Sequence, residues 1–161
     1  MGLSGKRSNK VVVANHVPKF RIRTKQLIAL TQVVLAKLGY RNTFLSLVLV
    51  SDAMIKRLNK QHLNHSWVTD VLAFPFSNSK GVPNRAGVHS FLGEIVISPK
   101  RAQVYSKEFQ VPFQEEFVRY VCHGVLHLKG YADHSKRTRK IMRHAEDGLI
   151  KLLSAKIKGV I

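Results

Sequence analysis

Residues 123–134 read His-Gly-Val-Leu-His-Leu-Lys-Gly-Tyr-Ala-Asp-His, and the rest of the chain is organised around this stretch. His123 and His127 are four residues apart, so on a helix they lie about 40° apart around the axis and about 6 Å apart along it. Their imidazole rings therefore leave the same face and can bind one metal ion. Gly130 tolerates a left-handed backbone, so it is well placed to end that helix and let the chain turn back.

The turn after Gly130 offers two further ligands, Asp133 and His134. Two ligands from the helix and one from the turn would leave the fourth position of a tetrahedral zinc ion for water. That arrangement is typical of a catalytic zinc site rather than a structural one. The common zinc-peptidase helix carries a glutamate directly after its first histidine as general base. Here Gly124 occupies that position, which argues against a peptidase.

Apolar segments typical of strands alternate with amphipathic segments along the rest of the chain. Strand-forming residues bounded by turn residues predict four strands, at residues 11–17, 43–50, 71–76 and 91–98. Helical periodicity, capping residues and prolines predict about five helices, at residues 24–38 and 53–62, from 99, from 112 and at 135–156. We therefore expect an α+β fold in which the helices pack on a small mixed sheet of four strands.

The composition of the chain indicates one basic domain. Its 161 residues fit a single domain, which we place at residues 11–157 after a flexible basic tail at 1–10. The excess of 27 Lys and Arg over 9 Asp and Glu gives a formal net charge of +18, which indicates a polyanionic partner, with nucleic acid as the first candidate. The single cysteine, Cys122, cannot form an internal disulfide, which favours a reducing, cytoplasmic location. No apolar stretch reaches the length of about 18 residues that a membrane-spanning helix needs.

Three blocks of the sequence, in order, resemble the YbeY family of bacterial endoribonucleases that mature ribosomal RNA. The stretch from His123 to Tyr131 is similar to the family's H-G-x-L-H-L-x-G-Y motif. Upstream, Thr69–Phe76 resembles its T-D-V-L-S-F-P-F block, and Leu92–Ser98 resembles its L-G-D-I-x-I-S strand. The resemblance covers roughly residues 10–155. It implies a single-strand-specific, metal-dependent endoribonuclease that holds one zinc ion and acts with the small ribosomal subunit in rRNA maturation and ribosome quality control.

The chain departs from the family motif at the third metal ligand. Asp133 stands where the family has its third histidine, and His134 follows one residue later. We expect Asp133 to be the third ligand beside His123 and His127, because its spacing needs no bulge, and we keep His134 as the alternative. The residue that does not bind the metal would orient the ligands or take part in acid–base catalysis. All four residues are therefore candidate catalytic residues.

A second departure concerns RNA binding. The family usually has an arginine, thought to contact RNA, at the position of Leu63, so Lys60, His62 or His65 would have to replace it here. A basic cluster follows the proposed metal loop and either faces solvent or binds the RNA backbone. The residues that we expect to bind RNA are Lys60, Arg137, Arg139 and Lys140.

Two other functions remain open from the sequence. One is a non-catalytic ribosome-assembly factor that binds RNA through its charge and uses zinc as a structural ion, which the loss of arginine at position 63 favours. The other is a zinc hydrolase that acts on peptides, which Gly124 and the basic composition disfavour. Nothing in the sequence predicts an oligomeric state.

Overall fold

The computed structural model describes residues 8–76 and 89–161. Residues 1–7 of the predicted tail therefore lie outside the described residues. The remainder of that segment is already part of the fold, because Asn9 is buried. Its side-chain amide donates a hydrogen bond to the backbone carbonyl of Tyr40, and its side-chain oxygen accepts hydrogen bonds from the backbone N–H and the hydroxyl of Thr43. The first strand begins directly afterwards, at Lys10, one residue before the position at which we expected the domain to start.

Four strands and five helices form the described chain, which confirms the predicted α+β class. The strands are β1 (Lys10–Asn15), β2 (Thr43–Leu49), β3 (Val71–Pro75) and β4 (Ser90–Ile97). The helices are α1 (Thr24–Lys37), α2 (Asp52–Leu63), α3 (Pro99–Glu108), α4 (Phe113–Lys129) and α5 (Lys136–Ile157). The sheet has the order β1-β2-β4-β3, in which β1, β2 and β4 are parallel and the edge strand β3 is antiparallel to β4.

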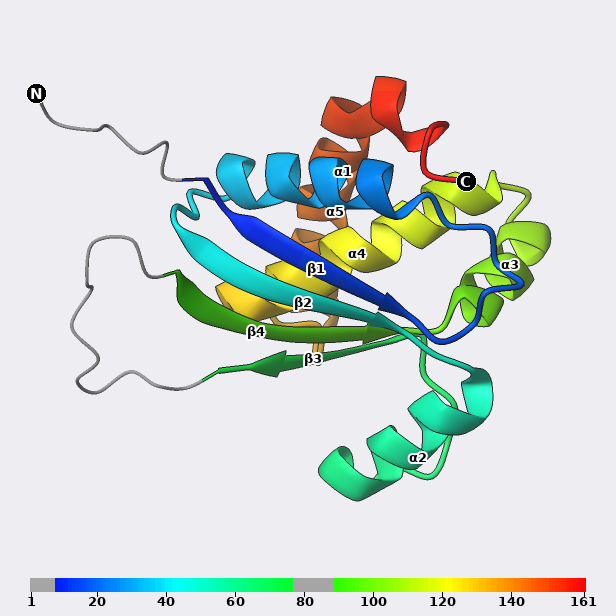
Figure 1. Cartoon of the computed structure of the whole chain (residues 1–161). Coiled ribbons are helices and arrows are strands. Elements are labelled where there is room, and N and C mark those ends of the chain that lie inside the picture. The colour runs from blue at the N-terminus through cyan, green and yellow to red at the C-terminus, as the bar shows by residue number, and fades with distance from the viewer. Residues whose placement is uncertain (1–7, 77–88) are drawn as a thin grey trace, which may run out of the picture.

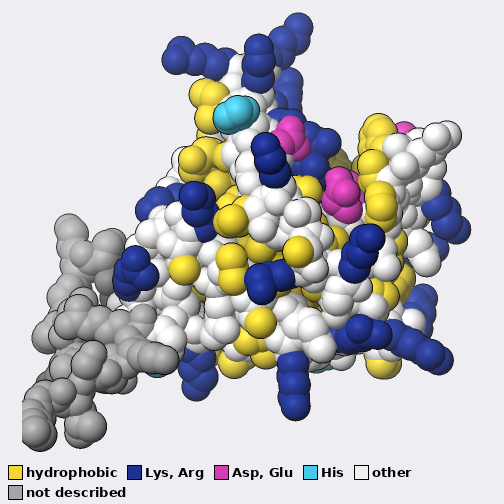
Figure 2. All heavy atoms as spheres, turned by 90° about the horizontal axis from the view of Figure 1, so that it is seen from above, with side chains coloured by type: hydrophobic (Ala, Val, Ile, Leu, Met, Phe, Trp, Pro, Cys, Tyr) yellow, Lys and Arg dark blue, Asp and Glu magenta, His cyan; other side chains and the backbone are white. Residues whose placement is uncertain are grey.

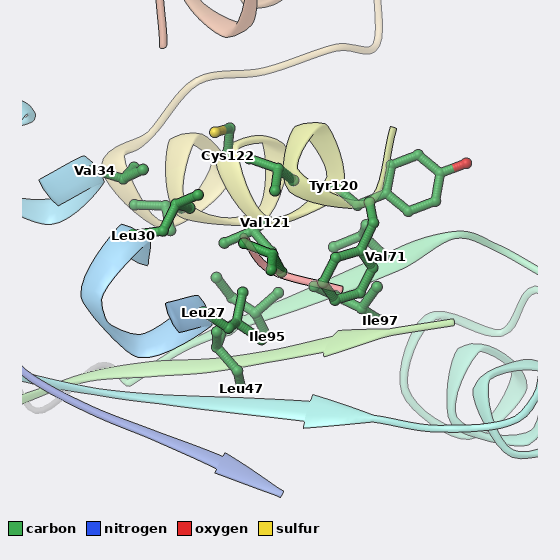
Figure 3. Close-up of a cluster of buried hydrophobic side chains, with 14 of the residues drawn as sticks. Leu27, Leu30, Val34, Leu47, Val71, Ile95, Ile97, Tyr120, Val121 and Cys122 are labelled. Atoms are coloured by element: carbon green, nitrogen blue, oxygen red, sulfur yellow. The ribbon is translucent and has the colours of Figure 1, made fainter. Parts of the chain in front are cut away.

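The sheet carries α1, α4 and α5 on one face, whereas α2 lies on the opposite side (Figure 1). Alternation along β2 explains this layering, because Leu45, Leu47 and Leu49 are fully buried in the main core, whereas the residues between them are only partly buried. Figure 3 shows how apolar side chains of α1, α4 and the strands meet between the helices and the sheet. The main core therefore lies directly under α4.

Gly124 allows α4 to approach the sheet closely. A Cβ atom at this position would lie 2.6 Å from Cγ2 of Ile95, a fully buried residue of β4. Interiors are close-packed, so a side chain here would push the helix and the strand apart. The residue that separates this chain from the zinc peptidases thus has a packing role, and it faces β4.

Helix α2 is attached mainly at its N-terminal end. Ser51 caps it by accepting a hydrogen bond from the backbone N–H of Met54. Asp52 forms an ion pair with Arg101 at 2.7 Å and accepts a hydrogen bond from the hydroxyl of Ser98 at 2.6 Å. A small second cluster lies beneath the helix and consists of Val50, Ile55, Leu72 and Val96. From this anchor the helix projects away from the sheet (Figure 1).

Candidate metal centre

Helix α4 carries both histidines of the predicted site. It begins directly after Pro112 and ends at Gly130, which adopts the left-handed conformation with a φ of 103°. The backbone N–H of Gly130 donates to the carbonyl of His127, which closes the helix and sends the chain back past its last turn. His123 and His127 therefore leave the same face of α4 in consecutive turns, and both are partly buried.

Three side chains converge at this end of α4. The Nε2 atoms of His123 and His127 are 2.9 Å apart, and Oδ2 of Asp133 lies 3.6 Å from the first and 3.4 Å from the second. Among the described residues, they form the group of histidine and carboxylate side chains that is close enough to share one ion. Ligands of a tetrahedral zinc ion, with bonds of about 2.0–2.1 Å, are separated by about 3.3 Å, so these donors fit such an ion. The side chain of Asp133 is 46% exposed, which leaves the site open to solvent.

The alternative third ligand, His134, does not join this group. Its side chain is exposed, and the converging atoms belong to His123, His127 and Asp133. The geometry thus favours Asp133, and its role as third ligand stays a prediction.

Both histidines are held in the tautomer that a metal ligand needs. Nδ1 of His127 lies 3.0 Å from the carbonyl oxygen of Tyr131, which can only accept, so Nδ1 carries the proton. Nδ1 of His123 lies 2.7 Å from Oε1 of Glu146 and donates to it. In each neutral ring the lone pair is then on Nε2, which points to the position where a metal ion would be bound.

Glu146 contacts the candidate site, and the sequence analysis missed it. It lies on α5, is only 5% exposed, and binds Arg119 of α4 at 3.3 Å as well as His123. Arg119 also binds Asp147 at 2.7 Å. Burial alone would lower the pKa of His123, but the hydrogen bond and charge of Glu146 outweigh it, so this pKa is raised. One signal was available: Glu146 follows Met142 by one helical turn on the otherwise apolar face of α5.

The basic residues predicted to bind RNA lie on two different helices. Nη1 of Arg139 donates to the backbone carbonyl of Asp133 at 3.3 Å, so this residue lies beside the proposed metal ligands. Arg137 and Lys140 are exposed in the same first turns of α5. Lys60 is exposed on α2, across the sheet from α5. Figure 2 shows one face of the molecule, over which Lys and Arg side chains are widely spread and Asp and Glu are few.

Cys122 takes no part in the site. It is fully buried in the main core, and burial raises the pKa of its thiol to about 12. A protonated, buried thiol does not bind metal, so Cys122 acts as a core residue. None of the helices formed by the described residues is long and apolar enough to cross a membrane.

Comparisons with known proteins show the family of this chain and agree with its fold. The family model described as endoribonuclease YbeY matches residues 12–154. The endoribonuclease YbeY of Flavobacterium psychrophilum is 36% identical over 109 residues, which cover 68% of this chain and 71% of the relative. The endoribonuclease YbeY of Aquifex aeolicus is 31% identical over 156 residues, which cover 96% of this chain and 98% of the relative. The solution structure of TM1509 from Thermotoga maritima aligns with a TM-score of 0.59 at 24% identity, covering 94% of this chain and 89% of the other, and supports the fold.

Proposed function

Because the chain belongs to the YbeY endoribonuclease family, we propose that it is a zinc-dependent endoribonuclease that cleaves single-stranded RNA. Its role would be the maturation of small-subunit rRNA and ribosome quality control in the cytoplasm. The observation that carries the proposal is the convergence of His123, His127 and Asp133 on one solvent-open position. Two imidazole nitrogens and a carboxylate oxygen are a donor set that zinc accepts in catalytic sites.

The residues of the site have distinct tasks in this proposal. Nε2 of His123, Nε2 of His127 and Oδ2 of Asp133 would hold the ion, which when bound supplies Lewis acidity and lowers the pKa of water. Glu146 and the carbonyl of Tyr131 keep the two rings oriented through their Nδ1 atoms. The basic start of α5 would hold RNA phosphates, and the exposed imidazole of His134 would exchange protons with the reacting groups.

Metal analysis and RNA cleavage test the proposal together. Purified wild type, His123→Ala, Asp133→Ala and His134→Ala would be compared for bound zinc and for cleavage of a single-stranded RNA. We expect His123→Ala and Asp133→Ala to lose the metal and the cleavage, and His134→Ala to keep the metal while cleaving more slowly. If His123→Ala retains both bound metal and cleavage, the proposed mechanism is wrong. Metal loss in His134→Ala but not in Asp133→Ala would make His134 the third ligand.

One observation favours the second candidate, an RNA-binding assembly factor with a structural zinc ion. Leu63 takes the position of the family arginine, and its apolar side chain is 51% exposed. A protein fully loaded with zinc that binds RNA and cleaves none, with other divalent metals also added, would support this candidate instead.

A further inference from the structure

Trp67, in the loop after α2, is the single tryptophan of the chain, and it is 60% exposed. Its indole stacks on the imidazole of His65, with ring centroids 4.3 Å apart and planes inclined by 16°. The two rings thus form a flat aromatic pair on the surface. Exposed aromatic rings that lie flat are the feature on which unpaired nucleobases stack in proteins that bind single strands.

The backbone beneath this pair is fixed. Asn59 of α2 is only 1% exposed, and its side-chain amide donates to the carbonyl of Trp67 at 3.0 Å. The backbone N–H of His65 donates to the carbonyl of the same asparagine, at 3.3 Å. Asn64, directly before His65, adopts the left-handed conformation that ends α2. A pre-organised pair loses less conformational entropy when a ligand binds than a mobile loop would.

The helix that precedes the pair carries exposed positive charge, which suits a polyanion. The exposed cations of α2 are Lys56, Arg57 and Lys60. Two acids occur in the segment 51–70, and both are engaged: Asp52 pairs with Arg101, and Asp70 accepts the backbone N–H of Val71 at 2.8 Å. Phosphates that flank a stacked base would therefore meet positive charge.

Although α2 projects from the face of the sheet opposite α4, its C-terminal end reaches the same strands that the metal-bearing end of α4 contacts. The ring of His62 contacts Phe74 of β3 edge-on, with centroids 5.1 Å apart. The backbone of Phe74 lies against Gly93 of β4, and Gly93 lies against the side chain of Leu128, the residue after His127. Because β3 is the edge strand, an RNA strand that contacts both helices would pass around this edge of the sheet.

We propose that Trp67, stacked on His65, is a base-stacking site for an unpaired nucleotide of RNA, with the α2 lysines bound to the neighbouring phosphates. The proposal rests on the proposed ribonuclease function, because it gives the substrate a second point of attachment away from the metal centre. It also implies selection for single strands, since the faces of bases within a duplex are covered by their neighbours.

The single tryptophan makes the stacking directly measurable. Metal-free protein in EDTA would be titrated with a single-stranded oligouridine and with a duplex RNA of equal length, and the indole emission recorded. We expect saturable quenching by the single strand and none by the duplex. Affinity measured independently with a labelled oligouridine should fall about tenfold or more in Trp67→Ala, and much less in Trp67→Phe, which keeps a stacking ring. The control is Phe109→Ala, which removes a similarly exposed aromatic ring directly after α3 and should leave affinity unchanged.

Two results would overturn the proposal. One is an emission that stays constant while the labelled oligouridine saturates the protein. The other is equal affinity of Trp67→Ala and Trp67→Phe for the single strand. Cleavage assays keep this test separate from that of the ribonuclease function: with metal present, Trp67→Ala should raise the KM for single-stranded RNA and change kcat little. Failure of the wild type to cleave RNA would refute the ribonuclease function and leave the stacking measurement intact.

Discussion

Glu146 is the one buried carboxylate among the described residues, and its contacts explain why it is tolerated there. It accepts a hydrogen bond from His123 and lies 3.3 Å from the guanidinium of Arg119, which is itself buried. A buried charge without such partners would be strongly destabilising. The carboxylate is thus balanced by Arg119 and orients His123, the first of the proposed metal ligands.

We expect Glu146→Gln to weaken metal binding about 10- to 100-fold while preserving the fold, because the side chain keeps its shape and loses the anionic acceptor for His123. A competition titration with a chelator measures the affinity, and ¹⁵N NMR of the metal-free protein reports which nitrogen of His123 carries the proton. Asp147→Asn is the matched control, since Asp147 binds the same Arg119 and does not contact the histidine. Unchanged affinity and tautomer in Glu146→Gln would contradict this role.

The difference between His127 and Glu146 shows what the sequence can predict about the site. His123 and His127 belong to one helix, so their spacing alone predicts that they share a face. Asp133 follows in the short loop directly after that helix. Glu146 lies 23 residues from His123 and reaches it because α5 folds back on α4. A buried acid on an apolar helix face indicates a partner, but the identity of that partner depends on tertiary packing.

The attachment of α2 depends on a polar contact as much as on its small apolar cluster. Burial alone would raise the pKa of Asp52, but hydrogen bonds from Ser98 and Arg101 and the charge of Arg101 outweigh it and lower this pKa. A lowered pKa means that the stabilisation is complete above the ordinary pKa, about 3.9, and is lost as the pH falls through the lowered value. At neutral pH the contact therefore holds α2 to the start of α3.

We expect Asp52→Asn to reduce the free energy of unfolding by about 1 kcal/mol at pH 7 and to free α2 selectively. Hydrogen exchange measures this: backbone amides of α2 should exchange faster, whereas those of α4 should keep most of their protection. Glu108→Gln, on α3 but outside this contact, is the control. The difference between Asp52→Asn and wild type should also vanish in acid, and a difference that persists there would show that the charge is not responsible.

Helices and strands were predicted closely, because each has a local signal. Ser51 caps α2, Gly130 ends α4, and the apolar run of β2 is typical of a strand, although only one of its faces is fully buried. The order β1-β2-β4-β3 has no such signal, since it depends on which distant segments bury each other's apolar faces. The α+β class therefore follows from local pattern, whereas the placement of α2 and α4 on opposite sides of the sheet emerges only from the structure.

The net charge of +18 raises a question that concerns the whole molecule, namely which of its many cations contact RNA. For single strands, the logarithm of affinity falls with the logarithm of salt concentration by roughly 0.7 for each phosphate neutralised. If Arg137, Arg139 and Lys140 bind phosphates, replacing all three by alanine should reduce that slope by roughly 2.

The same helix offers a control with the same loss of charge. Lys151 and Lys156 of α5, with Lys158 directly after it, are exposed at the end remote from the metal loop, so their triple alanine variant tests general electrostatic attraction alone. Binding of a labelled oligouridine to metal-free protein would be measured at several salt concentrations for both variants. We expect the first variant to lower the slope and the second to lower affinity slightly at low salt without changing the slope. Equal salt dependence of affinity in the two variants would mean that RNA responds to the net charge of the whole surface, and that the basic start of α5 has no special role.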